Sequence, residues 1–308
     1  MAVRVPEEGV PPVAKPADFD AFWSQTLTEA RSYGLDPSLI DDGTYSTRAV
    51  RVQRVAFTSL ERVRVGGWYC VPRGQGPFPA VLLLPGYGSH ASLAGRAMAQ
   101  EGIASLFLAV RGHSFGDQIT PGFPGFLCHN ITDKYRYIYR GAYCDAVLGL
   151  DFLAGRMEVD GRRTAVAGGS QGGALAIVAA ALAGPERVAA AAPDVPFLTN
   201  FKFSVARSPS YPFAEIADLL RRYPDLEERV WEALAYFDVA NFAPKVECPT
   251  LISVALKDDI CPPASLLAMA ATIKGQVDVR KYPDAGHEGG GLTHATLKLK
   301  WLKERLGA

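Results

Sequence analysis

A serine, a carboxylate and a histidine occur in an order that suits nucleophilic catalysis. Ser170 lies at the centre of residues 168–172, Gly-Gly-Ser-Gln-Gly, which match the pattern G-x-S-x-G, and Asp258 and His287 each follow a later apolar run. A serine hydroxyl becomes a nucleophile when a histidine takes its proton and a carboxylate orients that histidine. The order therefore predicts acyl transfer, with Ser170 as nucleophile, Asp258 as acid and His287 as base.

Other interpretations of these residues stay open at the level of sequence. The pentapeptide alone also fits an ordinary strand-to-helix corner, the aspartates a solvated loop, and His287 a loop histidine bonded to nearby backbone. Asp259 is an alternative acid and Asp284 a weaker one. Asp258 is preferred because it comes directly after the apolar run, and the joint occurrence of all three residues in order favours catalysis.

Two backbone amides are candidate donors to a developing oxyanion. The Gln171 amide follows the serine at the start of a predicted helix, where N–H groups are unpaired. The second donor in such sites comes from a loop after an early strand. In "LLLPGYGSH", Gly86 and Gly88 flank Tyr87, so that its N–H can approach a substrate, although the glycines also fit a plain turn.

The remaining cysteines and histidines predict neither a disulfide framework nor a metal site. The cysteines are scattered without C-x-x-C spacing and odd in number, which indicates buried thiols; Cys261 alone lies close to the candidate acid. His90 and His294 are interpreted as surface or helix residues and His129 as a loop contact. No His-x-x-x-His or Glu-x-x-His pair occurs, so we expect no metal and no cofactor.

Apolar runs that alternate with helix-like segments must position these side chains. The runs are nearly continuous, short, and ended by Gly or Pro, which is typical of parallel strands buried on both faces. They cover residues 79–88, 102–114, 163–170, 187–196, 248–259 and 276–287, and the helical segments lie near 91–101, 141–155, 171–183, 263–274 and 292–305. We expect an α/β fold with a mostly parallel central sheet, helices on both faces, and the site at one edge.

The parts of the chain outside this alternation are assigned to an extension and an insertion within one domain, 1–308. The N-terminal extension, 1–48, contains a predicted helix that Asp18 or Asp20 caps and that carries Phe22, Trp23 and Leu27 on one face. Alternating residues in 48–59 and 62–72 predict antiparallel strands with one solvated face. The aromatic-rich segment of about 196–245 predicts a helical insertion that lies over the ligand crevice like a lid.

Composition excludes several classes of partner. The chain has 308 residues, 48% of them hydrophobic, and 32 basic residues balance 32 acidic ones. Zero net charge and no basic run give no general attraction to nucleic acid or anionic lipid. The N-terminus does not look like a secretion signal and no segment is apolar for long enough to span a bilayer, so we expect a cytoplasmic protein.

Several segments together resemble one known family. The segments "KPADFDAFW", "PGYG", "RGHSFGD", "GGSQGGALA", "APDVPFL", "AYFDVANFA", "DDICPP" and "GHEGGG" are similar to the acetyl xylan esterase / cephalosporin C deacetylase family, carbohydrate esterase family seven, over about residues 5–305. The resemblance implies an α/β-hydrolase fold and a serine esterase that deacetylates small esters, including acetylated xylo-oligosaccharides and cephalosporin C. It also implies Ser170, Asp258 and His287 as the triad, the Tyr87 and Gln171 amides as oxyanion hole, and a homo-oligomer, a trimer or hexamer.

One departure from the family pattern concerns a motif that the resemblance places beside the active-site loop. The family typically has Arg-Gly-Gln where this chain has Arg111-Gly112-His113. Histidine keeps a hydrogen-bonding side chain but adds a titratable one, and we interpret His113 as structural. Two alternatives to the deacetylase remain: a related hydrolase with another acyl or peptide substrate, such as a peptidase or dienelactone-type enzyme, and an inactive hydrolase-fold ligand receptor.

Overall fold

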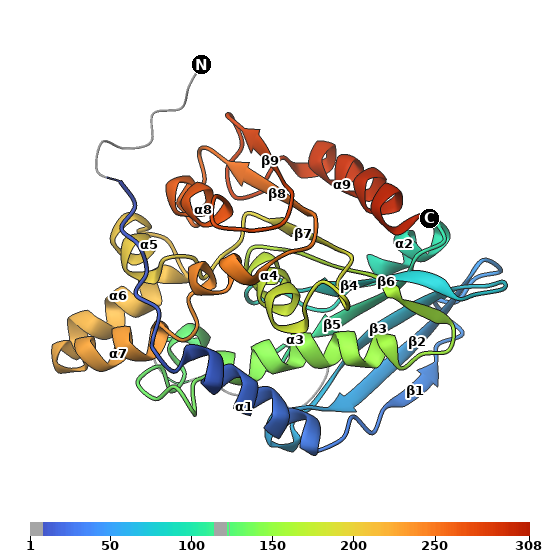
Figure 1. Cartoon of the computed structure of the whole chain (residues 1–308), viewed down its shortest axis with the longest axis horizontal. Helices are drawn as coiled ribbons and strands as arrows, with labels where there is room; N and C mark the ends of the chain where they lie inside the picture. The colour runs from blue at the N-terminus through green and yellow to red at the C-terminus, as the bar shows by residue number, and fades with distance from the viewer. Residues whose placement is uncertain (1–8, 114–121, 123) are drawn as a thin grey trace.

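The computed structural model describes residues 9–113, 122 and 124–308, and one nine-stranded sheet runs through this part of the chain (Figure 1). The strands are β1 Ser38–Asp41, β2 Val50–Thr58, β3 Arg64–Pro72, β4 Phe78–Leu84, β5 Ala104–Ala109, β6 Val159–Gly169, β7 Ala190–Asp194, β8 Thr250–Ala255 and β9 Val277–Tyr282. Their order is β1-β2-β3-β5-β4-β6-β7-β8-β9. Pairing is parallel from β5 to β9 and antiparallel from β1 to β5, which confirms the mostly parallel sheet.

Helices cover both faces of the sheet, as predicted. They are α1 Phe19–Ser32, α2 Gly95–Gln100, α3 Ile138–Ala154, α4 Gln171–Ala183, α5 Phe201–Arg207, α6 Phe213–Arg222, α7 Glu227–Leu234, α8 Pro263–Ala270 and α9 Gly291–Leu306. Helices α2 and α9 lie side by side, joined by a 2.6 Å bond from Lys303 Nζ to Glu101 Oε2 (Figure 1). None of the helices in the described ranges is long and apolar enough to cross a membrane.

The nearly continuous apolar strands supply two hydrophobic cores because successive side chains point to opposite faces. On β4, Val81 packs with Trp301 and Leu302 of α9, whereas Leu82 belongs to the larger cluster on the face that α1, α3 and α4 cover. Burial on both faces explains why these strands lack a polar alternation. This burial also holds in place the carboxyl ends of the strands, which the candidate site residues follow.

The antiparallel edge differs from the sequence prediction in two respects. Strand β1 lies inside the segment that was assigned to the extension, and the first eight residues of that extension lie outside the described residues. The expectation of one solvated face is wrong for β3, which has no exposed residue. Cys70 of β3 packs with Val50 and Val52 of β2 and with Ala99 of α2. The short helix α2 therefore covers the face that was expected to be exposed to solvent.

Helix α1 buries Phe22, Trp23 and Leu27, as the periodicity predicts. The predicted cap is wrong. Asp18 occupies the position before the helix, but its side chain makes no capping bond. Its carboxylate instead pairs with Lys134 Nζ at 2.9 Å, which fastens the start of the helix to another part of the chain.

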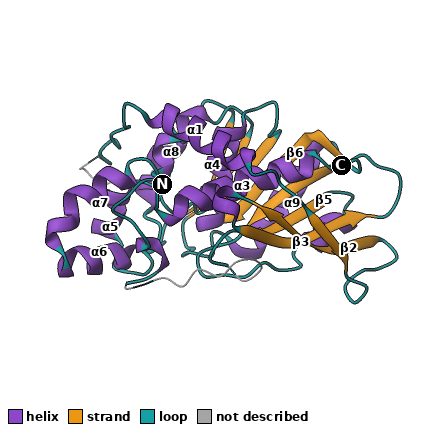
Figure 2. Ribbon diagram, turned by 90° about the horizontal axis from the view of Figure 1, so that it is seen from below, coloured by secondary structure: helices purple, strands orange, loops and turns teal. Residues whose placement is uncertain are grey.

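The segment between β7 and β8 is helical, as predicted, and contains α5, α6 and α7. Figure 2 shows these three helices gathered at the end of the molecule away from β2 and β3. The insertion is tied to α1, because Trp23 Nε1 donates to the Tyr236 carbonyl at 3.0 Å and the Trp23 ring lies 5.6 Å from Phe237. These contacts pack α1 against the segment that follows α7.

Candidate active site

Ser170 lies on a strained turn between β6 and α4. Strand β6 ends at Gly169 and α4 begins at Gln171, and between them Ser170 has φ 55° and ψ −119°. A side chain rarely adopts a positive φ, and such strain is typical of a nucleophile held on a sharp strand-to-helix turn. The Ser170 amide donates to the Asp194 carbonyl at 2.9 Å, so neighbouring β7 holds the turn in place.

The glycines around the serine are required by close backbone contacts. A Cβ on Gly172 would lie 2.1 Å from the Leu84 carbonyl oxygen, and one on Gly168 would lie 2.5 Å from the Gly172 carbonyl carbon. Both distances are too short for any side chain. The G-x-S-x-G pattern is thus a consequence of packing α4 against the ends of β4 and β6.

The structure brings Ser170, Asp258 and His287 together. His287 Nε2 lies 3.0 Å from Ser170 Oγ, and His287 Nδ1 lies 2.9 Å from Asp258 Oδ2. These are hydrogen-bond distances on both sides of one imidazole, which is the arrangement that lets a histidine exchange a proton with a serine. The residues follow β6, β8 and β9, which lie in this order along the sheet with β7 between β6 and β8.

The surroundings select Asp258 among the three candidate carboxylates. It is buried, and its Oδ1 accepts hydrogen bonds from the Ile260 and Cys261 amides at 2.9 Å each, which fix the carboxylate toward His287. Asp259 accepts from Ser210 in the insertion. Asp284 points to solvent, with its side chain 93% exposed beside Lys257.

The loop after β4 lies against the serine turn. Gly88 has φ 67°, a conformation that favours glycine, and Gln171 Nε2 donates to the Pro85 carbonyl at 3.3 Å. Among the residues that the structure describes, neither the Tyr87 amide nor the Gln171 amide donates to a backbone carbonyl. Both N–H groups therefore stay candidates for an oxyanion hole.

The Gln171 side chain has a role that the sequence did not indicate, since only its amide was assigned one. It is completely buried, and its Oε1 accepts from the Tyr139 hydroxyl at 2.7 Å while its Nε2 reaches the loop after β4. The side chain therefore links α3, α4 and this loop. No periodicity or motif rule would assign that position a bridging amide.

Glu215 of α6 is a further residue that the sequence did not single out. Tyr87 Oη donates to Glu215 Oε1 at 2.6 Å, and the Leu127 amide donates to Glu215 Oε2 at 3.0 Å. Burial raises the pKa of the Glu215 carboxyl, although these hydrogen bonds oppose that effect. Glu215 thereby joins the insertion to the loop that carries the Tyr87 amide.

The motif of Arg111, Gly112 and His113 follows β5 and has a distinct contact at each position. The Arg111 guanidinium is buried and bonds Asp145 Oδ1 at 2.8 Å. A Cβ on Gly112 would meet the Phe126 ring at 2.0 Å, and Gly112 also has φ 81°. His113 Nε2 lies 3.2 Å from the Gly86 carbonyl oxygen, so the motif touches the loop after β4. The next residues of the matching segment, 114–117, lie outside the described residues.

All five cysteines are free and buried, as expected. The Cys261 thiol, the Asp258 carboxylate and the His287 ring offer ligand atoms within 4.8 Å of one another. Burial raises the pKa of the Cys261 thiol, and thiols bind metals as thiolates. Asp258 already accepts bonds from two amides and the His287 ring, so the cluster suits an acid–base pair better than a cation.

The other histidines behave mostly as expected. His90 is exposed, His129 lies in a loop and His294 lies in helix α9, where it is buried. Its Nε2 lies 2.9 Å from Asp194 Oδ1 and its Nδ1 lies 2.8 Å from the Tyr282 hydroxyl. The Asp194 carbonyl accepts from the Ser170 amide, so His294 contacts the serine turn indirectly, through Asp194.

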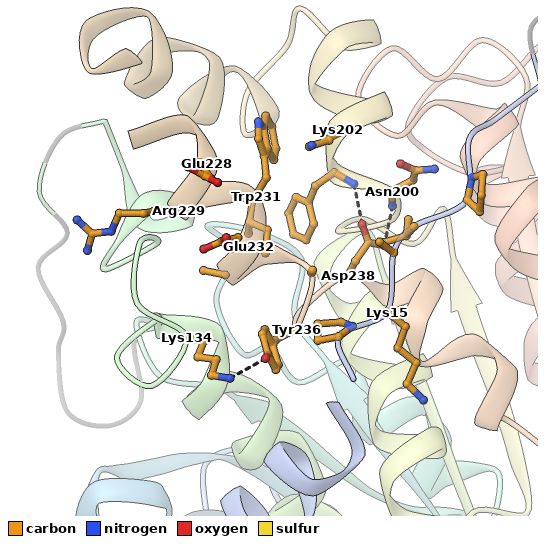
Figure 3. Close-up of a pocket in the computed structure, with 18 of the residues that line it drawn as sticks. Lys15, Lys134, Asn200, Lys202, Glu228, Arg229, Trp231, Glu232, Tyr236 and Asp238 are labelled. Carbon is orange, nitrogen blue, oxygen red and sulfur yellow. Dashed lines mark hydrogen bonds between the residues drawn. The ribbon is translucent and has the colours of Figure 1, made fainter. Parts of the chain in front are cut away.

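A separate pocket of about 860 Å³ lies between the N-terminal extension and the insertion. Figure 3 shows Trp231 and Lys202 on one side of it and Tyr236, which accepts from Lys134 Nζ at 2.6 Å, on another. Neither Ser170 nor His287 lines this pocket. It is therefore distinct from the candidate active site.

Comparison with known proteins identifies the family. A family model described as acetyl xylan esterase matches residues 8–305. The acetyl esterase Axe7A of Xylanibacter ruminicola is 29% identical over 98% of this chain and 70% of its own. Among solved structures, the acetyl xylan esterase of Paenibacillus sp. R4 is 32% identical with a TM-score of 0.89, and acetyl xylan esterase 1 of Thermoanaerobacterium sp. JW/SL YS485 is 26% identical with a TM-score of 0.88; each match covers 96% of both chains. The fold is the α/β-hydrolase fold, and the chain belongs to the acetyl xylan esterase family.

Proposed function

We propose that this protein is a serine esterase that removes acetyl groups from small esters. The observation that carries the proposal is the His287 ring, whose two nitrogens lie 3.0 Å from Ser170 Oγ and 2.9 Å from Asp258 Oδ2. The acetyl specificity is supported by membership of the acetyl xylan esterase family and by relatives that are named acetyl and acetyl xylan esterases. The ester hydrolysis itself is supported by the geometry of the site.

In the first half of the reaction, Ser170 Oγ attacks the acetyl carbonyl carbon while His287 Nε2 takes the hydroxyl proton. Asp258 holds the imidazole by Nδ1 and stabilises its positive charge. The carbonyl oxygen becomes an oxyanion, which accepts hydrogen bonds from the Tyr87 and Gln171 amides. The ester bond then breaks, His287 returns the proton to the departing alcohol, and the acetyl group stays on Ser170.

In the second half, water replaces the alcohol. His287 takes a proton from the water, whose oxygen attacks the acetyl-enzyme carbonyl, and the same two amides bind the second oxyanion. Collapse of this intermediate breaks the bond to Ser170 Oγ, which regains its proton from His287. Acetate leaves, and the enzyme returns to its starting state.

Acetate release from p-nitrophenyl acetate tests the nucleophile. Ser170→Ala should lower kcat by at least about 10³-fold, because removing a triad nucleophile leaves only the binding and oxyanion contributions. Ser38→Ala, on exposed β1, is the matched serine control and should keep the activity. If Ser170→Ala kept the wild-type rate, the assignment of Ser170 would be wrong.

A series of p-nitrophenyl esters tests the acyl group. We expect the acetyl ester to have the highest kcat/KM, with a clear fall at butyryl and longer chains. A preference for butyryl or larger groups would contradict the deacetylase proposal and favour a related hydrolase. Acetylated xylo-oligosaccharides and cephalosporin C are the proposed small substrates, and their relative kcat/KM values would rank them.

The insertion is proposed to close one side of the active site. Its Glu215 holds the Tyr87 hydroxyl at 2.6 Å, and its Ser208 Oγ donates to the Asp259 carbonyl at 2.7 Å. Both contacts reach segments next to the proposed catalytic residues.

We also propose that the protein assembles as a trimer or hexamer. Light scattering in solution measures the molar mass, and a monomer would contradict this proposal.

A further inference from the structure

The carbonyl that His113 contacts belongs to the same peptide group as the proposed oxyanion donor. His113 Nε2 lies 3.2 Å from the Gly86 carbonyl oxygen. In a trans peptide, the C=O of one residue and the N–H of the next are coplanar and point in opposite directions. A group that holds the Gly86 oxygen on one side therefore aims the Tyr87 N–H to the other.

The Gly86 carbonyl is held by Ser89 as well. The Ser89 hydroxyl donates to it at 2.8 Å and the Ser89 amide at 3.1 Å, both from within the same turn. His113 is the contact that reaches this carbonyl from a different strand, because it follows β5. The contact with His113 therefore fixes the orientation of the Gly86–Tyr87 peptide relative to the sheet, whereas the Ser89 contacts fix it only relative to the loop.

The ring nitrogen that faces Gly86 must carry a proton for this contact to be favourable, because a carbonyl oxygen only accepts. Gln171 Nε2 lies 3.3 Å from the same ring nitrogen and donates one of its two hydrogens to the Pro85 carbonyl, so the other partners of the ring decide the tautomer. His113 Nδ1 is buried and, among the described residues, makes no hydrogen bond of good geometry, although the Val110 and Arg111 backbone lies close to the ring. An unpaired lone pair costs less than an unpaired N–H, which favours the Nε2–H form. Burial also lowers the pKa of His113, which keeps the ring neutral.

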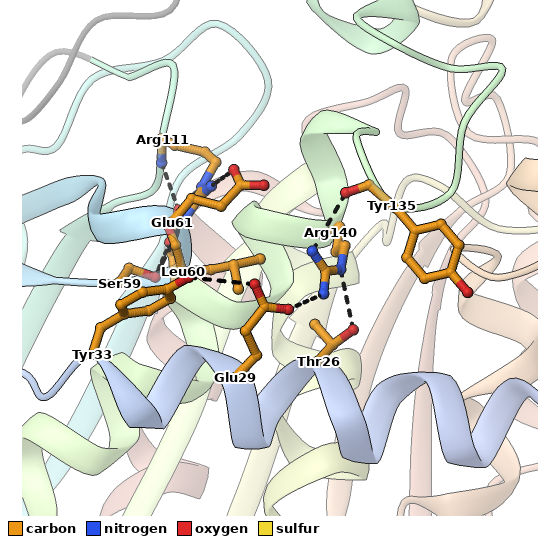
Figure 4. Close-up of polar contacts among 10 residues, drawn as sticks. Thr26, Glu29, Tyr33, Ser59, Leu60, Glu61, Arg111, Tyr135 and Arg140 are labelled. Carbon is orange, nitrogen blue, oxygen red and sulfur yellow. Dashed lines mark hydrogen bonds and ion pairs between the residues drawn. The ribbon is translucent and has the colours of Figure 1, made fainter.

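His113 is held in place through Arg111, two residues before it. The Arg111 guanidinium donates to the Leu60 carbonyl at 3.1 Å, and Figure 4 shows it packed beside Ser59, Leu60 and Glu61. The Arg111 amide donates to Asp145 Oδ2 at 2.9 Å, so the backbone is fixed as well as the side chain. His113 is itself 5% exposed. Its ring is therefore a fixed support for the loop after β4.

We propose that His113, as its Nε2–H tautomer, is a positioning residue for the oxyanion hole: it orients the Gly86–Tyr87 peptide so that the Tyr87 N–H points at the substrate oxyanion. This inference rests on the proposed esterase function. It gives His113, the residue at which this chain departs from the family pattern, a role in transition-state binding. His113 touches neither the substrate nor Ser170 in this role.

Kinetics of four full-length variants test the role. Loss of an oxyanion donor costs about 10²–10³-fold in kcat, and misdirection of one should cost about 10–100-fold. We expect His113→Leu and His113→Met to lower kcat for p-nitrophenyl acetate by that amount and to leave KM within about twofold. His113→Gln supplies another N–H donor and should stay within about threefold of wild type. Ser105→Ala is the matched control: it removes a buried 2.7 Å bond to the Gly95 carbonyl, remote from the site, and should keep kcat.

Two kinetic results would overturn the proposal. One is a wild-type kcat in His113→Leu and His113→Met; the other is a His113→Gln variant as slow as these two. A rise in KM with a wild-type kcat belongs to the first of these results, because it would show a loss of ground-state binding and not of transition-state binding. If Ser170→Ala proved fully active, the esterase assignment would fail instead, so the two failures are distinguishable.

A second measurement does not depend on activity or on the folding of the apolar variants. Nitrogen-15 NMR of the imidazole rings at neutral pH reports which nitrogen carries the proton, and the His113→Gln spectrum identifies the His113 signal. The proposal requires a protonated Nε2. A proton on Nδ1 instead would show that Nε2 accepts from Gln171, and the proposal would be wrong.

Discussion

The buried pair of Arg111 and Asp145 allows a quantitative prediction for Asp145→Asn. Asp145 is completely buried in α3, and its two oxygens accept from the Arg111 guanidinium at 2.8 and 3.0 Å, from the Arg111 amide at 2.9 Å and from Ser59 Oγ at 2.5 Å. Asparagine has the same shape but no charge, and its NH₂ group would face one of these donors. Glu61 lies 3.8 Å from the guanidinium but is 56% exposed, so it replaces the lost charge poorly.

The magnitude follows from the burial of both partners. Removing one member of a buried ion pair costs about 3–5 kcal/mol, because the other charge is left without a partner. At about 2–4 °C per kcal/mol, or somewhat less for a chain of this size, the melting temperature should fall by about 5–15 °C. Since Arg111 fixes the turn that carries His113, we also expect a lower kcat in the folded variant.

Urea unfolding followed by tryptophan fluorescence, at low and at high salt, measures this cost. The control is Asp284→Asn, whose carboxylate lies at the same 2.8 Å distance from Lys257 but with side chains 93% and 63% exposed. An exposed pair contributes about 1 kcal/mol or less and is screened by salt. Equal midpoints for the two variants, or a loss in Asp145→Asn that disappears at high salt, would refute the reasoning.

Three further predictions concern the site and its support. Asp258→Asn should lower kcat by about 10³–10⁴-fold because the histidine loses its orienting carboxylate, whereas Asp284→Asn should leave kcat unchanged. Steady-state hydrolysis of p-nitrophenyl acetate compares the two variants. If Asp284→Asn were the slower variant, the acid would be Asp284 and not Asp258. Gly172→Ala should abolish most activity and destabilise the protein, since its Cβ would lie 2.1 Å from a backbone oxygen, whereas Gly43→Ala, with open space around it, should melt and react like wild type. The lowered pKa of His113 means that the unfolded chain binds a proton in a pH range where the folded chain does not. The ring therefore adds no cost above the unfolded pKa of about 6.5, and the free energy of unfolding decreases as the pH falls below it. Urea midpoints should therefore fall more between about pH 7.5 and pH 5 for wild type than for His113→Gln, and parallel decreases would contradict this.

Much of the fold could be predicted from short-range patterns. Strand–helix alternation located β4 to β9 and the helices between them, because buried parallel strands require uninterrupted apolar residues. Prediction failed where a second element covers a surface that the local pattern cannot reveal. Strand β3 looked half-solvated because α2, which buries its outer face, comes from a segment some thirty residues further along the chain and leaves no mark on the β3 sequence.

The candidate site divides in the same way. Ser170, Asp258 and His287 could be chosen because chemistry restricts the residue types and the topology restricts their order. Asp18 was misassigned because a capping residue and the acid of a long-range ion pair look alike in sequence. Glu215 and Asp145 carried no signal at all, since their partners Tyr87 and Arg111 are distant along the chain.

The sequence by itself thus determined the fold class, the family resemblance and the candidate reactive side chains, because those depend on residue type, local periodicity and order. Tertiary structure alone decided which carboxylate faces His287, which side chains contact the loop after β4, and that His113 lies against the Gly86 carbonyl. These are questions of distance and direction between segments far apart in the chain. Burial then sets their energies, and burial is a property of the folded protein rather than of any one segment.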